Sequence, residues 1–243
     1  MEKGLLHDRR WMLVDENNIF MTQRIYPQMA LFRLAIDHDR MSITKKNALN
    51  GHPSISVNVD IPPMGDVIES KVFDDAVTVV EVDEKISLWF TEQLGTRCKL
   101  VSFPEKNARP VDPEFKVNDE HVSLADAYPF LIIGQSSLDD LNSRMKESLP
   151  MNRFRPNFVF TGGDPFEEDT WRNFTIGKNR FIGVKPCARC AVPTVNQDTG
   201  EKGKEPTATL ATYRNRNNKT YFGQNLLALD HEEISVGDKI TLN

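Results

Sequence analysis

Two cysteines separated by two residues carry the side chains best suited to chemistry in this sequence. Cys187 and Cys190 enclose Ala188 and Arg189, and Lys185 precedes them. The two cationic side chains favour a thiolate over a thiol. A thiolate is a soft ligand for transition metals, so one cysteine could hold a metal whose other ligands come from something other than protein.

Three other interpretations of this pair stay open. A structural zinc site needs further ligands, and Cys98, His121 and His231 lack zinc-finger spacing. A thioredoxin-like dithiol requires a helix N-terminus, whereas residues 191–195 contain Pro193 and are expected to be extended. The two thiols could also simply pack as small hydrophobic groups.

Arginine residues form a second candidate site. Arg9 and Arg10 precede one predicted strand, and the segment 153–157 (RFRPN) precedes another. A guanidinium and a carboxamide at strand entrances can hold a phosphate and the polar edge of a heterocycle, although each arginine alone could be a solvated surface charge. The segment 161–164 (TGGD) nearby could be a plain turn.

Composition limits the classes of function. The chain has 243 residues, 39% of them hydrophobic, which suits a globular protein of one large or two small domains. With a net charge of -5, the chain has no overall positive charge with which to bind nucleic acid or an anionic membrane. Any site that binds an anion must therefore be a local group of basic residues. The longest apolar run, 130–133, is too short for a membrane span and no signal peptide is evident, so we expect a cytoplasmic protein.

The sequence also limits where redox electrons come from. Three cysteines cannot supply the four thiolates of an ordinary iron–sulfur cluster, and they make a disulfide framework improbable. No Walker loop, dinucleotide fingerprint or His-Glu-x-x-His motif is present. A redox reaction here would therefore need a separate donor protein.

Short strands should position these residues in a β-rich, α+β protein. The pattern predicts a hairpin over 11–21, strands with one wet face at 32–36 and 55–59, a strand at 77–82, and a helix over 86–94 that ends at Gly95. Three prolines at 104–113 mark a domain boundary, with domains at 1–103 and 104–243.

The second half continues with strands around one helix. A buried strand is expected at 131–133, followed by a helix that Ser136 or Ser137 caps. The further strands expected are 158–160, 174–176, 180–184, 226–229 and 239–242.

An ordered series of motifs resembles a known family over nearly the whole chain. The series comprises 4–14 (GLLHDRRWMLV), 153–157, 161–164, 185–190 (KPCARC), 194–195 with 198–200, and 222–225 (FGQN). It resembles proteins with a MOSC N-terminal β-barrel domain followed by a MOSC β-barrel domain. Within that family it is similar to the mitochondrial amidoxime reducing component and its bacterial counterparts.

The resemblance implies a molybdenum cofactor, a pterin dithiolene with a phosphate. Cys190, the second cysteine of the motif, matches the family's metal ligand and catalytic centre. Arg9 matches the arginine that meets the anionic cofactor, and Arg155 and Asn157 match residues that hold the pterin. The family's opening strand, which ends in Tyr-Pro-x-Lys-Ser, would precede the first residue here. Pyridoxal phosphate binding is also associated with the family.

The resemblance further implies an activity and its partners. The expected reaction is reduction of N-hydroxylated compounds, with electrons from a separate flavin or iron–sulfur protein. The alternative is a non-catalytic module in which Cys190 or Cys187 carries sulfur or the cofactor for delivery.

Overall fold

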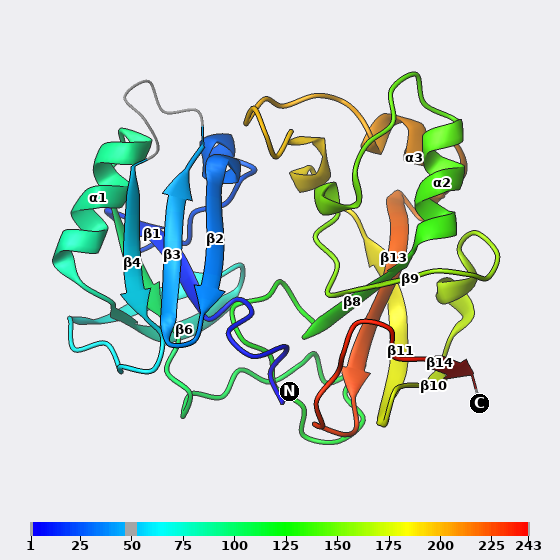
Figure 1. The fold of residues 1–243 in the computed structure, drawn as a ribbon, viewed down its shortest axis with the longest axis horizontal. Coiled ribbons are helices and arrows are strands. Elements are labelled where there is room, and N and C mark those ends of the chain that lie inside the picture. The colour runs from blue at the N-terminus through cyan, green and yellow to red at the C-terminus, as the bar shows by residue number, and fades with distance from the viewer. Residues whose placement is uncertain (1, 47–52, 243) are drawn as a thin grey trace. The chain divides into compact units, whose positions relative to one another are not determined.

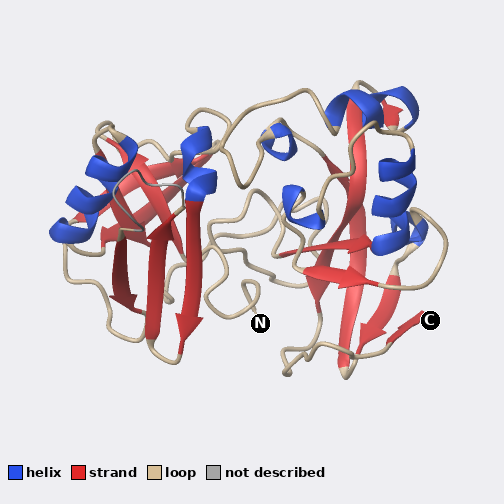
Figure 2. Cartoon of the chain, turned by 45° about the horizontal axis from the view of Figure 1, so that its top comes forward, coloured by secondary structure: helices blue, strands red, loops and turns tan. Residues whose placement is uncertain are grey.

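The fold is strand-rich, as the sequence predicts. The computed structural model describes residues 2–46 and 53–242, which contain three α-helices and divide into two compact units (Figure 1). The C-terminal unit comprises Met1–Asp8, Pro110–Thr194 and Gly203–Asn243, and the N-terminal unit comprises Arg9–Arg109 and Val195–Lys202. Strands dominate both units (Figure 2). No helix in the described ranges is long and apolar enough to cross a membrane.

An antiparallel four-stranded sheet forms one part of the N-terminal unit. Its order is β1 (Trp11–Asp15), β7 (Cys98–Ser102), β6 (Asp75–Glu81) and β5 (Val67–Val72). The predicted hairpin turn after β1 forms because the Asp15 carboxylate accepts hydrogen bonds from the backbone N–H groups of Asn17 and Ile19, each at 2.9 Å. Its second arm is reduced to a single bridge between Val14 and Phe20.

A three-stranded sheet in the same unit corrects one prediction. Its order is β2 (Phe32–Asp37), β3 (Arg40–Lys45) and β4 (Ser54–Asn58). Alternation in β2 predicts one buried face, but Leu34 is 58% exposed and Ile36 is 46% exposed. The prediction is wrong because the side chains of β2 beyond Phe32 lie outside the core, to which β3 and β4 contribute Met41, Ile43 and Val57.

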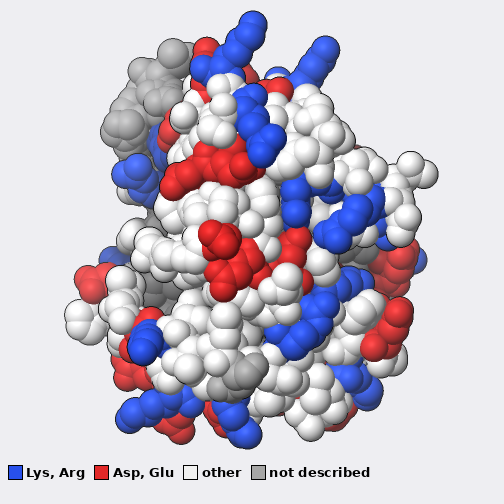
Figure 3. All heavy atoms as spheres, turned by 90° about the vertical axis from the view of Figure 1, so that its right-hand side faces the viewer, with Lys and Arg blue, Asp and Glu red and all other residues white. Residues whose placement is uncertain are grey.

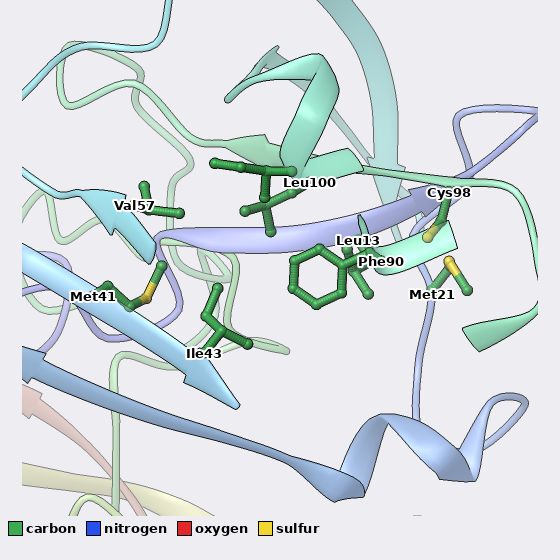
Figure 4. Packing of buried hydrophobic residues seen from close by; sticks show 9 residues of the cluster. Leu13, Met21, Met41, Ile43, Val57, Phe90, Cys98 and Leu100 are labelled. Carbon is green, nitrogen blue, oxygen red and sulfur yellow. The ribbon is translucent and has the colours of Figure 1, made fainter. Parts of the chain in front are cut away.

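The core of the N-terminal unit lies between these sheets and α1 (Glu84–Leu94). Figure 4 shows its side chains, among them Leu13, Met41, Phe90 and Leu100. The helix has the predicted C-terminus, because Gly95 adopts the left-handed φ of 66° that ends a helix. Its N-terminus is capped by the Asp83 side chain, which accepts a hydrogen bond from the Lys85 N–H.

A larger sheet forms the C-terminal unit. Its order is β14 (Ile240–Leu242), β10 (Asn173–Ile176), β11 (Asn179–Ala188), β13 (Lys219–Ala228), β8 (Phe130–Gly134) and β9 (Phe158–Phe160), and β12 (Asn215–Arg216) pairs with β13. Only β8 and β9 run parallel. The predicted strands at 180–184 and 226–229 are parts of the ten-residue strands β11 and β13, which pair along most of their length.

The helices of the C-terminal unit correct one further prediction and add one helix that was not predicted. In α2 (Gln135–Ser143) the N-cap is Gly134, and no side chain caps it. Ser137 instead donates a hydrogen bond to the buried Glu168 carboxylate at 2.9 Å, and Glu168 also accepts the Gly134 N–H. The sequence analysis did not predict α3 (Thr207–Tyr213).

The connecting segments include four short 3-10 helices. These are Pro27–Leu31, Met151–Arg153, Glu167–Thr170 and Val192–Thr194. The last of them lies in the segment 191–195, so that segment is not simply extended as predicted.

Candidate functional site

The cysteine motif lies at the end of β11. Cys187 is the penultimate residue of the strand, and Cys190 follows two residues after its end. Ala188 pairs with Tyr221 of β13, and the Arg189 N–H donates to the Thr220 carbonyl at 2.8 Å. Strand β13 therefore fixes the backbone of the two residues that separate the cysteines. A strand location also differs from the helix N-terminus that a thioredoxin-like dithiol needs.

The two thiols of this motif have different surroundings. Cys187 packs against a hydrophobic cluster that includes Phe154 and Phe222, and its Sγ lies 3.1 Å from a guanidinium nitrogen of Arg189. Cys190 is half-buried, and its thiol makes no hydrogen bond to any residue in 2–46 or 53–242. Cys190 is therefore the thiol of this motif whose sulfur stays available to a ligand.

Arg189 connects the cysteine motif with the arginine-containing segment 153–157. A second guanidinium nitrogen donates to the Phe154 carbonyl at 2.9 Å, and the guanidinium lies 5.5 Å from the centre of the Phe154 ring. One side chain thus contacts Cys187 and the residue before Arg155. The structure brings together the two groups that the sequence analysis identified separately, and Arg189 was not among the predicted site residues.

The two arginines of this segment have opposite environments. Arg153 is only 6% exposed and donates to the carbonyl oxygens of Pro193 at 2.8 Å and Glu205 at 3.3 Å. Burial lowers the pKa of Arg153 below its ordinary value. The Arg153 side chain therefore holds the backbone at Pro193, three residues after Cys190, and at Glu205.

Arg155 is the exposed arginine of this pair. It has a φ of 55°, a left-handed conformation that is strained for a residue before proline. Strained backbone of this kind clusters at active sites and ligand clamps. Its predicted role as an anion-binding residue stays a prediction.

The Asn157 side chain already has protein partners. Its Oδ1 accepts the Leu131 N–H at 3.0 Å, and its Nδ2 donates to the Asp8 carboxylate at 2.8 Å. These bonds fix the segment against β8 and leave one N–H for a ligand. Arg9 follows Asp8 but belongs to the N-terminal unit, so its role at a cofactor stays a prediction.

The FGQN motif, residues 222–225, forms part of the scaffold beneath the cysteine strand. Gly223 has a φ of 81°, and a Cβ there would lie 2.7 Å from Ile133 Cγ1, so only glycine fits. Gln224 is fully buried, and its amide can donate to the Lys185 carbonyl and accept from Arg172, each at 3.0 Å. This motif therefore fixes the strand that carries Cys187.

The third cysteine does not belong to this site. Cys98 is buried in β7 of the N-terminal unit, and burial raises the pKa of its thiol. Within the described ranges no group of three or more His, Cys, Asp or Glu side chains could enclose a metal ion. The described residues therefore offer no ligand set for a structural zinc site. The TGGD segment is a turn, with left-handed φ values at Gly162 and Gly163.

Family models match both parts of the chain. Residues 119–241 match the MOSC domain, and residues 1–97 match the MOSC N-terminal beta barrel domain. The chain therefore belongs to the MOSC-domain family.

The chain is similar to two groups of curated proteins, amidoxime-reducing components and molybdenum cofactor sulfurases. Over its full length the chain is 30% identical to mitochondrial amidoxime-reducing component 1 of Homo sapiens, 74% of which it covers. It is 33% identical to mitochondrial amidoxime reducing component 2 of Bos taurus, over 88% of this chain and 64% of that protein. It is also 30% identical to a molybdenum cofactor sulfurase of Oryza sativa subsp. japonica, over 98% of this chain but only 31% of the sulfurase. The chain thus spans about a third of the sulfurase.

Proposed function

We propose that this protein binds the molybdenum cofactor and reduces N-hydroxylated compounds with electrons from a separate reductase protein. The observation that carries the proposal is the Cys190 thiol, which is half-buried at the end of β11 and has no hydrogen-bond partner in the described chain. The names of the amidoxime-reducing relatives supply the reaction class.

The donor set fits this cofactor. The family resemblance implies that a dithiolene-bound molybdenum ion takes one protein cysteine as a ligand, and a single thiolate without another partner could supply it. Cys187 is less suited because Arg189 and the hydrophobic cluster around Phe154 already engage it. When bound, the cofactor would supply the two-electron chemistry that cleaves the N–O bond.

The protein's own residues would bind the cofactor and hold it in position. Cys190 would hold the metal, the Arg155 and Arg9 guanidiniums would bind the cofactor's anionic groups, and the remaining Asn157 N–H would meet its pterin. Arg189 and Arg153 would act as positioning residues, because they fix the backbone before and after Cys190. In each turnover the hydroxyl oxygen leaves as water, and two electrons and two protons are consumed.

The second candidate is a module that carries the cofactor or its sulfur without turnover. The similarity to molybdenum cofactor sulfurases supports it, because this chain covers only about a third of such an enzyme. Such a module would need the same available thiol.

Metal analysis and turnover distinguish the two candidates. The protein is purified from cells that make the cofactor, and molybdenum and pterin are measured per chain. Benzamidoxime reduction is then measured with viologen radical as donor. Bound cofactor with turnover supports the reductase, and bound cofactor without turnover supports the carrier. A chain that binds neither molybdenum nor pterin would contradict the reductase and the cofactor carrier, and would leave only the carrier of sulfur.

A further inference from the structure

Two segments around the cysteine motif contain basic residues and no acidic residue, although the chain has 35 acidic and 30 basic residues. These segments are 180–194 and 206–229. Their basic residues are Arg180, Lys185, Arg189, Arg214, Arg216 and Lys219. Arg180 is paired with Asp230 at 2.8 Å at the far end of β11, so the positive charge near Cys190 comes from the other residues of this set.

Two of these arginines are stacked on aromatic rings. The Arg214 guanidinium lies 4.2 Å from the centre of the Phe166 ring, and that of Arg216 lies 5.2 Å from the Tyr221 ring. Both contact the same carboxylate, Asp169, with Arg216 at 3.5 Å. One carboxylate between two guanidiniums leaves a net positive charge. Because the two arginine side chains are already held against aromatic rings, they would lose little conformational entropy when a partner binds.

The hairpin of β12 and β13 presents this charge to solvent beside the cysteine motif. The side chain of Arg216 is 58% exposed, and Lys219 is also exposed. Thr220 accepts the Arg189 N–H at 2.8 Å, which joins the hairpin to the residue before Cys190. We call Arg216 and Lys219 the hairpin patch, which excludes Arg214 because its side chain is 13% exposed and paired with Asp169. Figure 3, which faces the side of the molecule that carries α2, shows basic and acidic side chains interspersed over that face.

We infer that the electron-donor protein docks on the hairpin patch through a cluster of its own Asp and Glu carboxylates. The inference rests on the proposed function, because a reductase without its own electron source needs such a donor. Guanidiniums bind carboxylates in bidentate geometry, and opposite charges accelerate association. Nucleic-acid-binding domains carry a basic face that a chain of net charge -5 lacks, whereas a local basic patch is enough to recognise an acidic patch on a protein.

Charge reversal tests the patch, with a control on the same sheet. Lys219→Glu and the double variant Arg216→Glu with Lys219→Glu are compared with Lys178→Glu. Lys178 is an exposed lysine in the turn between β10 and β11, at the other end of β11 from the cysteine motif. Donor-dependent benzamidoxime reduction and direct binding are measured with a small [2Fe–2S] ferredoxin of acidic surface.

The double variant should lose at least tenfold in kcat/KM for the ferredoxin at low ionic strength, and the loss should shrink in 0.5 M salt. Viologen-driven reduction should stay at the parent rate, as should all rates of Lys178→Glu. If the double variant and the control had equal kinetics with the ferredoxin and equal affinity for it, the docking surface would be overturned. Turnover with viologen in the same experiment would still support the proposed reductase activity. Patch-dependent ferredoxin binding without any turnover would support the surface and contradict the proposed function.

Discussion

The Arg189 guanidinium donates a hydrogen bond to the Cys187 sulfur at 3.1 Å, while the Cys190 thiol has no such partner in the described chain. The same guanidinium donates to the Phe154 carbonyl. Two cysteines that look equivalent in the sequence thus have different surroundings: Arg189 and a hydrophobic cluster contact Cys187, whereas the Cys190 thiol has no such partner in the described chain.

Arg189→Gln should destabilise the C-terminal unit. It removes the charge-assisted bond to Cys187 and one to a backbone carbonyl, so we expect a loss of about 1–3 kcal/mol in the free energy of unfolding. Urea denaturation measures this loss. Arg216→Gln is the control, because that side chain is 58% exposed and should cost little. Equal stabilities of the two variants would contradict a scaffold role for Arg189.

Arg155→Ala and Arg9→Ala should each lower cofactor retention at least tenfold. Each would remove a charge-assisted contact to an anion, worth about 1.5–3 kcal/mol. Pterin and molybdenum per chain measure retention after gel filtration. Lys178→Ala, which removes an exposed charge elsewhere in the C-terminal unit, should retain the parent amounts. Parent-like retention in both arginine variants would show that these arginines are only surface charges.

The scaffold role of Gly223 can be separated from backbone strain. Gly223→Ala places a Cβ 2.7 Å from Ile133 in a left-handed backbone, and should destabilise the fold by more than about 1 kcal/mol. Gly237→Ala has a similar φ of 97° but no atom within 4 Å, so it reports strain alone. Thermal denaturation should place Gly223→Ala below Gly237→Ala. The reverse order would be inconsistent with the close approach of β13 to β8.

Glu168 should make stability depend on pH. Burial raises the pKa of this carboxyl, and the nearby Asp169 adds to the effect. The folded state therefore binds the proton more tightly than the unfolded state, so this contribution is full below the ordinary carboxyl pKa and is lost as pH rises through the folded pKa.

Glu168→Gln should remove that decrease in stability with rising pH. Urea denaturation at a series of pH values from 4 upward, compared with the exposed-residue control Glu147→Gln, measures it. A parent-like slope in Glu168→Gln would mean that Glu168 does not cause the dependence.

Local signals in the sequence predicted some elements well and others poorly. The helix that ends at Gly95 was predictable because its apolar spacing and its C-terminal glycine are both local. The N-terminus of α2 was not, because its carboxylate partner Glu168 lies 31 residues beyond Ser137. Leu34 in β2 was predicted to lie on the buried face of its strand, but it is 58% exposed because this part of β2 does not reach the core.

In the candidate site too, the residue types were predictable from the sequence, but their contacts were not. The sequence identified Cys187, Cys190 and the arginine segment as chemically suitable. It could not identify which thiol is engaged, because that depends on Arg189 reaching Phe154, 35 residues away. Arg153 and Arg155 look alike in sequence, yet only the fold buries one and exposes the other.

The molybdenum content of Cys190→Ser tests the central claim most directly. The variant, Cys187→Ser and the parent are purified in parallel from cells that make the cofactor, and molybdenum per folded chain is measured by mass spectrometry. Cys190→Ser should lose molybdenum and benzamidoxime reduction, whereas Cys187→Ser should keep part of both. Parent-like molybdenum and turnover in Cys190→Ser would contradict its assignment as the metal ligand.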